Sequence, residues 1–379
     1  MATVNTSTDR TEQRARLSSL MESLGLDAVV LSSYQAVSYF AGTHIMTQVS
    51  LPDRLEFFVL FGDGSPALLL CSIETGMAKT QTDIDEIAEY TEFVDVPAEA
   101  AAKLLAQRGV TSGRIGFEAR RLHSEAQADL RRVLPDVELV GIDDALEQLQ
   151  SVKTPSEIDM LRFAAESTLA AVLGAAASAK PGDTELSVCA EITSRLMGAG
   201  GIYNFMVFGS GGRAIGAHVE ATDQPLREGA IWRIDLGARF FETINSDLAR
   251  VGVVGEPSSR QEEVVSALHA IQHAGYEAME PGRPACDVFF AVKNEYQRQR
   301  MPFSMPHVGH GLGIGLHEAP ILEPGNRTPL AAGMVLNVEP MVILPDEGEC
   351  YHTEDLAVVT PEGYELLTPP QEALIRIGD

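Results

Sequence analysis

Residues 305–318 read MPHVGHGLGIGLHE. Two histidines in this stretch, His310 and His317, stand seven positions apart among glycines and apolar residues. Isolated histidines are usually structural, but the glycines favour a functional interpretation because they allow close backbone approach and tight bends beside a ligand. A nucleotide-binding loop is disfavoured, since the glycines lack a flanking strand, a helix start and a following acidic residue. The stretch therefore predicts a loop that carries functional histidines.

Carboxylates mark the strands predicted on either side of this loop. Asp235 and Asp247 flank a predicted hairpin turn, so paired strands would bring both side chains to one face. Two buried like charges require a cation or a proton, although aspartates beside a hairpin are commonly just solvated turn residues. Glu339 and Glu354 stand at the ends of apolar runs, where an unpaired carboxylate is unfavourable. The four carboxylates therefore predict a shared cation site.

The ligand types indicate which cations would bind there. Carboxylates with the imidazole of His310 are hard, oxygen-rich ligands that suit Mn²⁺ or Co²⁺ first, with Fe²⁺ or Zn²⁺ as alternatives. Two divalent metal ions would balance the charge, and hydroxide held between them would form at neutral pH. His269 and His273, four positions apart on a predicted helix, lack a third ligand and are better explained as a solvated helix face.

Composition and charge limit the class of protein. The 379-residue chain is 45% hydrophobic and 22% charged, which is typical of a globular protein with two domains. Its net charge of −26 repels phosphate backbones and anionic membranes, so we expect neither nucleic acid nor a membrane as a partner. The apolar run Leu169–Ala179 is about half as long as a bilayer span, and we expect a buried helix there.

Cysteine usage and the first residues bear on the cellular compartment. Residues 1–10 lack the cationic start and apolar run of a signal peptide, and they are typical of a mobile tail. The four cysteines show neither C-x-x-C spacing nor a disulfide framework; they are Cys71, Cys189, Cys286 and Cys350. We therefore expect a cytoplasmic protein.

The first 150 residues predict an α/β domain without concentrated chemistry. Apolar residues recur at helical spacing from Arg14 until Gly25, and a hairpin signal joins the apolar runs 55–61 and 67–71. Further predicted elements are strands at 27–33, 114–117 and 137–141 and helices near 97–108 and 123–133. Alternating helices and strands favour a sheet covered by helices.

Residues 151–379 predict an α+β domain with one curved, mostly antiparallel sheet. Thr154-Pro155-Ser156-Glu157 is a capping box that begins a long helix, and Ser259-Arg260-Gln261-Glu262 is expected to be a second one. Strands are predicted at 205–208, 231–238, 250–254, 334–339 and 354–359, and helices over 184–197 and 285–299. The four carboxylates lie on or beside these strands.

Taken together, these motifs resemble the metal-dependent pita-bread hydrolases. That group includes Xaa-Pro dipeptidase (prolidase), aminopeptidase P and methionine aminopeptidase, with creatinase as a metal-free relative. The resemblance covers roughly residues 150–370 and includes all five metal-ligand motifs in order. The stretches GLDAVV at 25–30 and YFAG at 39–42 look like the amino-terminal domain that prolidase and creatinase share. Because methionine aminopeptidase lacks that domain, the resemblance favours the prolidase side.

The resemblance implies a role for each candidate ligand. Asp235 would chelate one metal and Asp247 would bridge the two. His310 would bind the second metal, Glu339 would bind the same metal while shuttling a proton, and Glu354 would be the second bridge. Creatinase does not keep this carboxylate set, so a complete set speaks for a metallohydrolase.

The resemblance also assigns histidines to the substrate. His218 matches the histidine that steadies substrate and leaving group, and His317 matches the one that binds the scissile carbonyl and stabilises the oxyanion. His307 and His352 are further candidates for facing the substrate. The chain departs from prolidases in having His352 where an arginine usually stands, Gly229-Ala230 where Gly-Asp is common, and a turn between the two aspartates that is about one residue longer.

These implications define the expected activity. We expect a metal-dependent hydrolase of Xaa-Pro dipeptides or short peptides, working through metal-bridging hydroxide, with a homodimer implied by the family. A creatinase-like or ectoine-type hydrolase of a non-peptide amide or cyclic amidine is the alternative that His352 keeps open. A non-catalytic pita-bread binding protein is a third possibility, which a complete ligand set disfavours.

Overall fold

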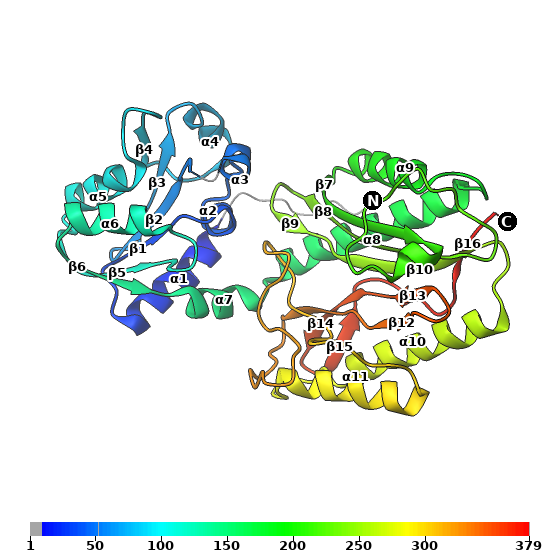
Figure 1. Cartoon of the computed structure of the whole chain (residues 1–379). Coiled ribbons are helices and arrows are strands. Elements are labelled where there is room, and N and C mark those ends of the chain that lie inside the picture. The colour runs from blue at the N-terminus through cyan, green and yellow to red at the C-terminus, as the bar shows by residue number, and fades with distance from the viewer. Residues whose placement is uncertain (1–9, 52, 379) are drawn as a thin grey trace. The chain divides into compact units, whose positions relative to one another are not determined.

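The computed structural model describes residues 10–51 and 53–378. The described chain divides into two compact units, with the boundary between Leu149 and Gln150 (Figure 1). The tail expected over residues 1–10 lies, apart from Arg10, outside the described residues. All four cysteines are free, as predicted.

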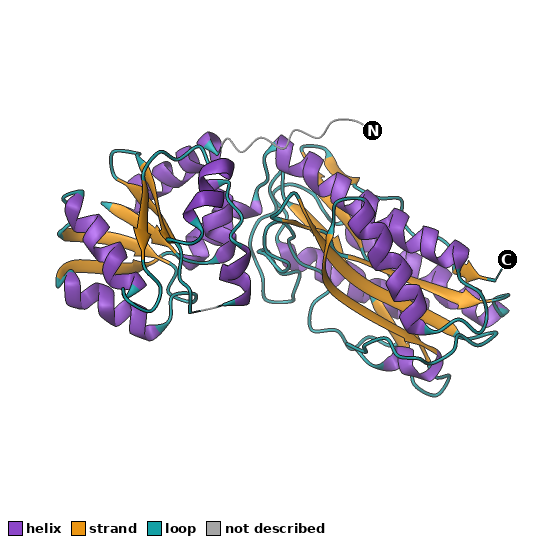
Figure 2. Ribbon diagram, turned by 90° about the horizontal axis from the view of Figure 1, so that it is seen from above, coloured by secondary structure: helices purple, strands orange, loops and turns teal. Residues whose placement is uncertain are grey.

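The N-terminal unit is an α/β domain, which confirms the predicted class. Its sheet has the order β4-β3-β2-β1-β5-β6, with β1, β2 and β3 antiparallel in turn and the other neighbours parallel. Helices lie on both faces of this sheet (Figure 2). The strands are β1 (Ala28–Leu31), β2 (Phe57–Phe61), β3 (Pro66–Cys71), β4 (Ile87–Tyr90), β5 (Ser112–Phe117) and β6 (Asp136–Gly141). The helices are α1 (Thr11–Leu24), α2 (Tyr34–Ala41), α3 (Met46–Ser50), α4 (Thr75–Gln81), α5 (Pro97–Gln107), α6 (Ser124–Val133) and α7 (Asp143–Ser151).

Local sequence explains the first elements of this unit. Helix α1 ends at Gly25, whose φ of +63° is left-handed and therefore suits glycine. Strands β1 and β2 are continuous apolar runs and are fully buried, because helices cover both faces of the sheet. The short helices α2, α3, α4 and α7 and strand β4 were not predicted from the sequence.

The C-terminal unit is an α+β domain with the expected pita-bread fold. Strands β16-β10-β8-β7 form the largest sheet, in which β9 also pairs with β8, while β11-β14-β15 and β12-β13 form two smaller ladders. All pairs are antiparallel except β10 with β16. The strands are β7 (Ile202–Ser210), β8 (Ile231–Phe240), β9 (Ile244–Asn245), β10 (Leu248–Val254), β11 (Val335–Val338), β12 (Met341–Leu344), β13 (Glu349–His352), β14 (Asp355–Thr360), β15 (Gly363–Leu366) and β16 (Ile375–Ile377). The helices are α8 (Pro155–Ser178), α9 (Glu185–Gly198), η1 (Gly211–Ile215, a 3₁₀ turn), α10 (Ser259–Glu277) and α11 (Ala285–Gln299).

The two capping boxes differ in how well they were predicted. Thr154 and Glu157 form the expected reciprocal bonds at the start of α8. The second box begins one residue earlier than predicted, because Ser258 is the N-cap and exchanges hydrogen bonds with Gln261. The extended backbone of Ser258 places its hydroxyl over the amide of the third helical residue, whereas Ser259 is already helical.

Helix α8 is longer than the apolar run that the sequence indicated. By length and composition alone it would qualify as a bilayer span, the one such helix within residues 10–51 and 53–378. More than half of its apolar window is buried inside the fold, and it packs against α9 and β8. These contacts are those of a core helix, as expected for this region.

Candidate metal centre

The two aspartates lie on one face of the β16-β10-β8-β7 sheet, the largest in the C-terminal unit. Asp235 is in β8, opposite Ala249 of β10. Asp247 comes directly before β10 and is almost fully buried. Because strand residues alternate between faces, the register of β8 against β10 places both carboxylates on the same side.

The turn between these strands closes at its tip without a register shift. Phe240 pairs with Ile244, so the turn consists of Phe241, Glu242 and Thr243. Phe241 and Glu242 both have left-handed backbones, with φ of 47° and 65°. The ladders from β8 to β9 and to β10 share one register, so the longer turn is accommodated without a β-bulge between β8 and β10.

The two glutamates come from the smaller ladders. Glu339 stands between β11 and β12, and Glu354 between β13 and β14. The amide N–H of Glu354 donates to the carbonyl of Ala249 at 3.1 Å, which joins the ladder of β14 to β10. The side-chain amide of Asn337 donates to the Glu354 carboxylate. Glu354 is therefore fixed beside the aspartates of the other sheet.

His310 faces the carboxylates with one ring nitrogen. Its Nδ1 lies 2.9 Å from the carbonyl oxygen of Gly311, so Nδ1 carries the proton and Nε2 keeps its lone pair. Nε2 is 3.8 Å from Asp247 Oδ2 and 3.7 Å from Glu339 Oε1. Burial lowers the pKa of His310 to about 4, which keeps the ring neutral and able to bind a metal.

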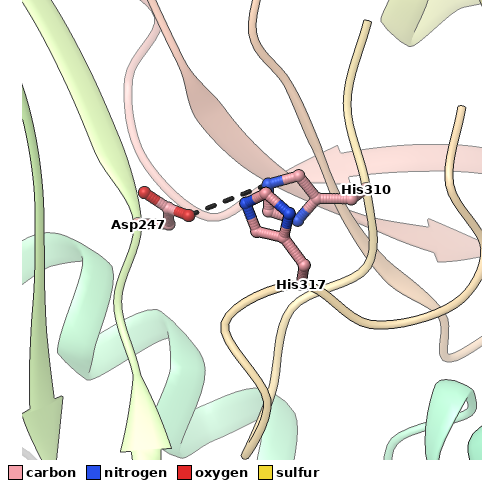
Figure 3. Close-up of side chains that lie close together, drawn as sticks. All are labelled: Asp247, His310 and His317. Carbon is pink, nitrogen blue, oxygen red and sulfur yellow. Dashed lines mark ion pairs between the residues drawn. The ribbon is translucent and has the colours of Figure 1, made fainter. Parts of the chain in front are cut away.

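Three overlapping groups of side chains have the geometry of cation sites. In each, three ligand atoms lie within 4.8 Å of one another. The groups are Asp235–Asp247–Glu354, His310–Glu339–Glu354 and Asp247–His310–His317. The structure thus brings together all five side chains that the sequence predicted as ligands, and His317 joins them. Figure 3 shows one of the three groups, Asp247 with His310 and His317.

The raised pKa values of the clustered carboxyl groups show that they need a compensating positive charge. Burial and, after it, the charge of Glu339 raise the pKa of Asp235 to about 7. Burial also raises the pKa of Asp247 and of Glu354 well above its usual range, and the neighbouring carboxylates add to both shifts. Such a cluster needs protons or cations, and two divalent ions match its four negative charges. The donor set therefore fits a pair of divalent metals.

Glu339 differs from the other three carboxylates. Burial alone would raise its pKa, but His307, His310 and His352 outweigh that effect and lower it. Its Oε1 lies 3.3 Å from Nδ1 of His307. Glu339 in turn raises the pKa of His307. The pair therefore keeps Glu339 ionised, as a proton acceptor must be.

The remaining candidate histidines occupy three different environments. The exposed ring of His317 stacks on His310, with centroids 3.8 Å apart. His218 lies on an exposed turn after η1 and belongs to none of the three groups in the described chain. His352 is buried in β13, also outside the groups, and neither of its ring nitrogens has a hydrogen-bond partner among the described residues.

Several polar residues that support the site were missed in the sequence. Asn337, fully buried in β11, accepts from the amide of His310 at 2.7 Å and donates to Glu354. Arg250 in β10 forms a buried ion pair with Asp355 and donates to the carbonyl of Glu354 at 2.9 Å. The sequence does contain a signal for both residues, because each is a polar residue inside an otherwise apolar strand. A polar side chain buried in this way requires a hydrogen-bond partner.

Arg233 is a further buried charged residue near the site that was not predicted from the sequence. It is fully buried in β8, two positions before Asp235, and donates to the carbonyls of Ala214, Gly216 and Ala217. Burial, and after it the charge of Arg233, lowers the pKa of His352 to about 4, and strand β13, which carries His352, packs against β8. Arg233 thus fastens the turn before His218 to the strand that bears Asp235.

The fold and this cluster define a metallohydrolase. Residues 159–361 match the model of metallopeptidase family M24, and residues 13–152 match the creatinase/prolidase N-terminal domain. The chain therefore belongs to metallopeptidase family M24, with a creatinase/prolidase N-terminal domain, as the resemblance implied.

Relatives and solved structures agree with this family over nearly the whole chain. The chain is 29% identical to the probable dipeptidase PepE of Mycobacterium bovis, over 89% of both proteins. It is 26% identical to the Xaa-Pro dipeptidase of Pyrococcus furiosus, over 96% of this chain and 99% of that one. The crystal structure of dipeptidase PepE from Mycobacterium ulcerans matches with a TM-score of 0.83 at 26% identity, over 98% and 99% of the two chains.

Proposed function

We propose that this enzyme is a two-metal exopeptidase that cleaves the Xaa-Pro bond of dipeptides or short peptides. The observation that carries the proposal is the set of three overlapping ligand groups, which share Asp247, His310 and Glu354. The names of the relatives, probable dipeptidase and Xaa-Pro dipeptidase, support the substrate class. Mn²⁺ or Co²⁺ are the ions that suit four carboxylates and an imidazole best, with Fe²⁺ or Zn²⁺ as alternatives.

In the proposed site Asp235, Asp247 and Glu354 would hold one divalent ion, and His310, Glu339 and Glu354 would hold the other. When bound, such a pair supplies Lewis acidity that polarises the scissile carbonyl and makes water nucleophilic at neutral pH. Proton transfer and substrate positioning would be carried out by side chains of the protein.

Glu339 is the proposed proton shuttle. It is ionised beside His307 and so can accept the proton of the attacking water and deliver it to the leaving nitrogen. Partial shielding of the His317 ring from water, with a smaller contribution from His307, lowers its pKa, so the ring is neutral and can donate an N–H to the carbonyl oxygen as negative charge develops there. His218, on its exposed turn, is free to steady the substrate.

Chelation and reconstitution test the proposal. Protein stripped with EDTA should lose Xaa-Pro cleavage and regain it with Mn²⁺ or Co²⁺, with Xaa-Ala dipeptides as the matched control for proline specificity. Full activity after chelation would exclude the metal mechanism. Metal-loaded protein that fails on every proline peptide but turns over creatine or ectoine-type compounds would favour the non-peptide alternative. Failure to bind any divalent ion would favour a binding protein.

The assembly and compartment are also proposals. A homodimer follows from the family resemblance, and size-exclusion chromatography with light scattering would measure it. Four free thiols suit a reducing compartment such as the cytoplasm.

A further inference from the structure

The glycine-rich loop that contains His317 is closed at its base. Gly311 and Glu318 form an isolated antiparallel bridge, in which their amides and carbonyls pair at 3.0 and 2.8 Å. Asn245 holds the other side of the loop, because its backbone N–H donates to the carbonyl of Gly313 at 2.9 Å. The loop therefore projects His317 from a fixed base.

The carboxylate of Glu318 lies inside this loop. Its Oε1 accepts from the backbone N–H of Gly315 at 2.6 Å. A Cβ at Gly313 would stand 2.7 and 2.9 Å from the two carboxylate oxygens, and a Cβ at Gly315 would stand 2.9 Å from Glu318 Cγ. Real Cβ atoms do not approach so closely, so a side chain at either position would push the Glu318 carboxylate out of its place in the loop.

Lys153 provides the opposite charge from a part of the chain outside the loop. Its Nζ lies 2.8 Å from Glu318 Oε2 and 3.2 Å from the carbonyl of Ser151. The two side chains are only 4% and 12% exposed. The backbone N–H of Lys153 donates to the carbonyl of Gly333 at 2.9 Å, which fixes the lysine beside the start of β11.

The His317 ring depends on this arrangement. It is exposed, and its described ring contacts are with His310 and His307. Its place over His310 is therefore set mainly by the backbone next to Glu318. A carboxylate buried without its counter-charge is strongly unfavourable, so removing Lys153 would drive Glu318 toward water and take the loop with it.

We propose that the ion pair between Lys153 and Glu318 is a positioning device for His317. This proposal rests on the proposed function, because it takes His317 to act on the scissile carbonyl. Neither residue belongs to the three ligand groups, so the pair acts on the placement of His317 and leaves metal binding intact. A displacement of about 1 Å in a catalytic group can cost roughly 100-fold in rate.

The test compares Lys153→Met, Glu318→Gln and the conservative Lys153→Arg with wild type, all metal-loaded. We expect Lys153→Met to keep its metal content, to speed amide hydrogen exchange in residues 311–318, and to lower kcat roughly 10- to 100-fold with little change in KM. Lys153→Arg should restore most of kcat. Glu318→Gln keeps the shape of the side chain, so it provides a second variant if Lys153→Met does not fold. The matched control is Arg162→Met, which removes the exposed pair with Glu365.

A His317→Ala background separates positioning from general damage. If Lys153 acts through His317, Lys153→Met should lower kcat no further in that background. The proposal would be overturned if Lys153→Met lowered kcat as much in the His317→Ala background as in wild type, or if its kcat stayed within twofold of wild type. It would also be overturned if Lys153→Met lost metal in parallel with activity, or if Arg162→Met had an equal effect. If wild type hydrolyses no peptide, the proposed function fails. Hydrogen exchange and the reactivity of His317 with diethyl pyrocarbonate would still decide whether the pair fixes the loop.

Discussion

The imidazole of His317 stacks on that of His310, with the ring planes 29° apart. The buried member of the pair, His310, is 1% exposed and points Nε2 at Asp247, whereas His317 is open to solvent (Figure 3). Two rings in contact thus differ in their surroundings, because His310 faces the buried carboxylates and His317 faces solvent. The sequence motif alone presents them as equivalent histidines on one loop.

This inequality predicts different consequences for the two alanine variants. His310→Ala should lose metal, because it removes a neutral buried donor. His317→Ala should keep both ions and lose roughly 100- to 1,000-fold in kcat, since it removes a donor to the developing oxyanion. Metal analysis and steady-state kinetics on the same preparations would measure the metal content and the kcat of both variants. Loss of one ion from His317→Ala would instead make His317 a ligand.

Glu339→Gln should lower kcat by about 10²- to 10⁴-fold, because the amide cannot accept a proton. The control is Glu349→Gln on the neighbouring strand β13, which lies outside the three ligand groups and should stay active. Kinetics with saturating Mn²⁺ would separate loss of the shuttle from weaker metal binding. An active Glu339→Gln variant would contradict the assigned role.

Asn337→Ala should weaken metal binding about 10- to 100-fold without unfolding the protein. The substitution leaves the amide of His310 and the carboxylate of Glu354 without their shared partner. Calorimetric titration with Mn²⁺ would measure the change, with Asn326→Ala, in the loop before β11, as the control. Unchanged affinity would mean that the backbone alone holds the ligands in place.

Glu56→Gln should flatten the dependence of stability on pH. Burial raises the pKa of Glu56 from 4.5 to about 8 in the folded state, so the folded protein holds a proton that the unfolded chain releases. The free energy of unfolding therefore falls as pH rises through this window, by up to about 5 kcal/mol for this group. Urea unfolding in EDTA at pH 5, 7 and 9 would test this, with exposed Glu89→Gln as the control. Parallel curves for Glu56→Gln and wild type would contradict it.

His352→Arg should destabilise the fold by about 3 kcal/mol or more, because it buries a second cation beside Arg233. Adding Arg233→Met removes that conflict, so the double variant should unfold at a higher temperature than His352→Arg alone. A thermal double-mutant cycle would give the coupling between the two positions. Strictly additive effects would show that the two side chains act independently.

The sequence predicted most of the long elements and both fold classes. Helix α8 was recognisable from Thr154 and Glu157, because a capping box is a purely local signal. The short helices α2 to α4 and the strands β12, β13, β15 and β16 escaped prediction. Their three to eight residues are too few to show a period, and tertiary contacts decide their conformation.

The candidate ligands were predictable because each is a polar group in a distinctive local setting, and the family resemblance placed them in order. Their supporting contacts were not predictable. Lys153 and Glu318 are 165 positions apart, and Arg250 and Asp355 are 105 apart. No local pattern encodes such pairs, and only the assembled sheets bring them together. The same holds for Arg233, whose partners lie in the turn at 214–217.

The bridge between Ala249 and Glu354 has a consequence for how the protein matures. Asp235 and Asp247 come from the first half of the domain, and Glu354 reaches them only when the ladder of β14 docks on β10. A partly folded chain therefore offers only scattered, low-affinity carboxylates. We therefore expect tight binding of two metal ions only after the C-terminal unit has folded, because the complete set of ligands does not exist before then.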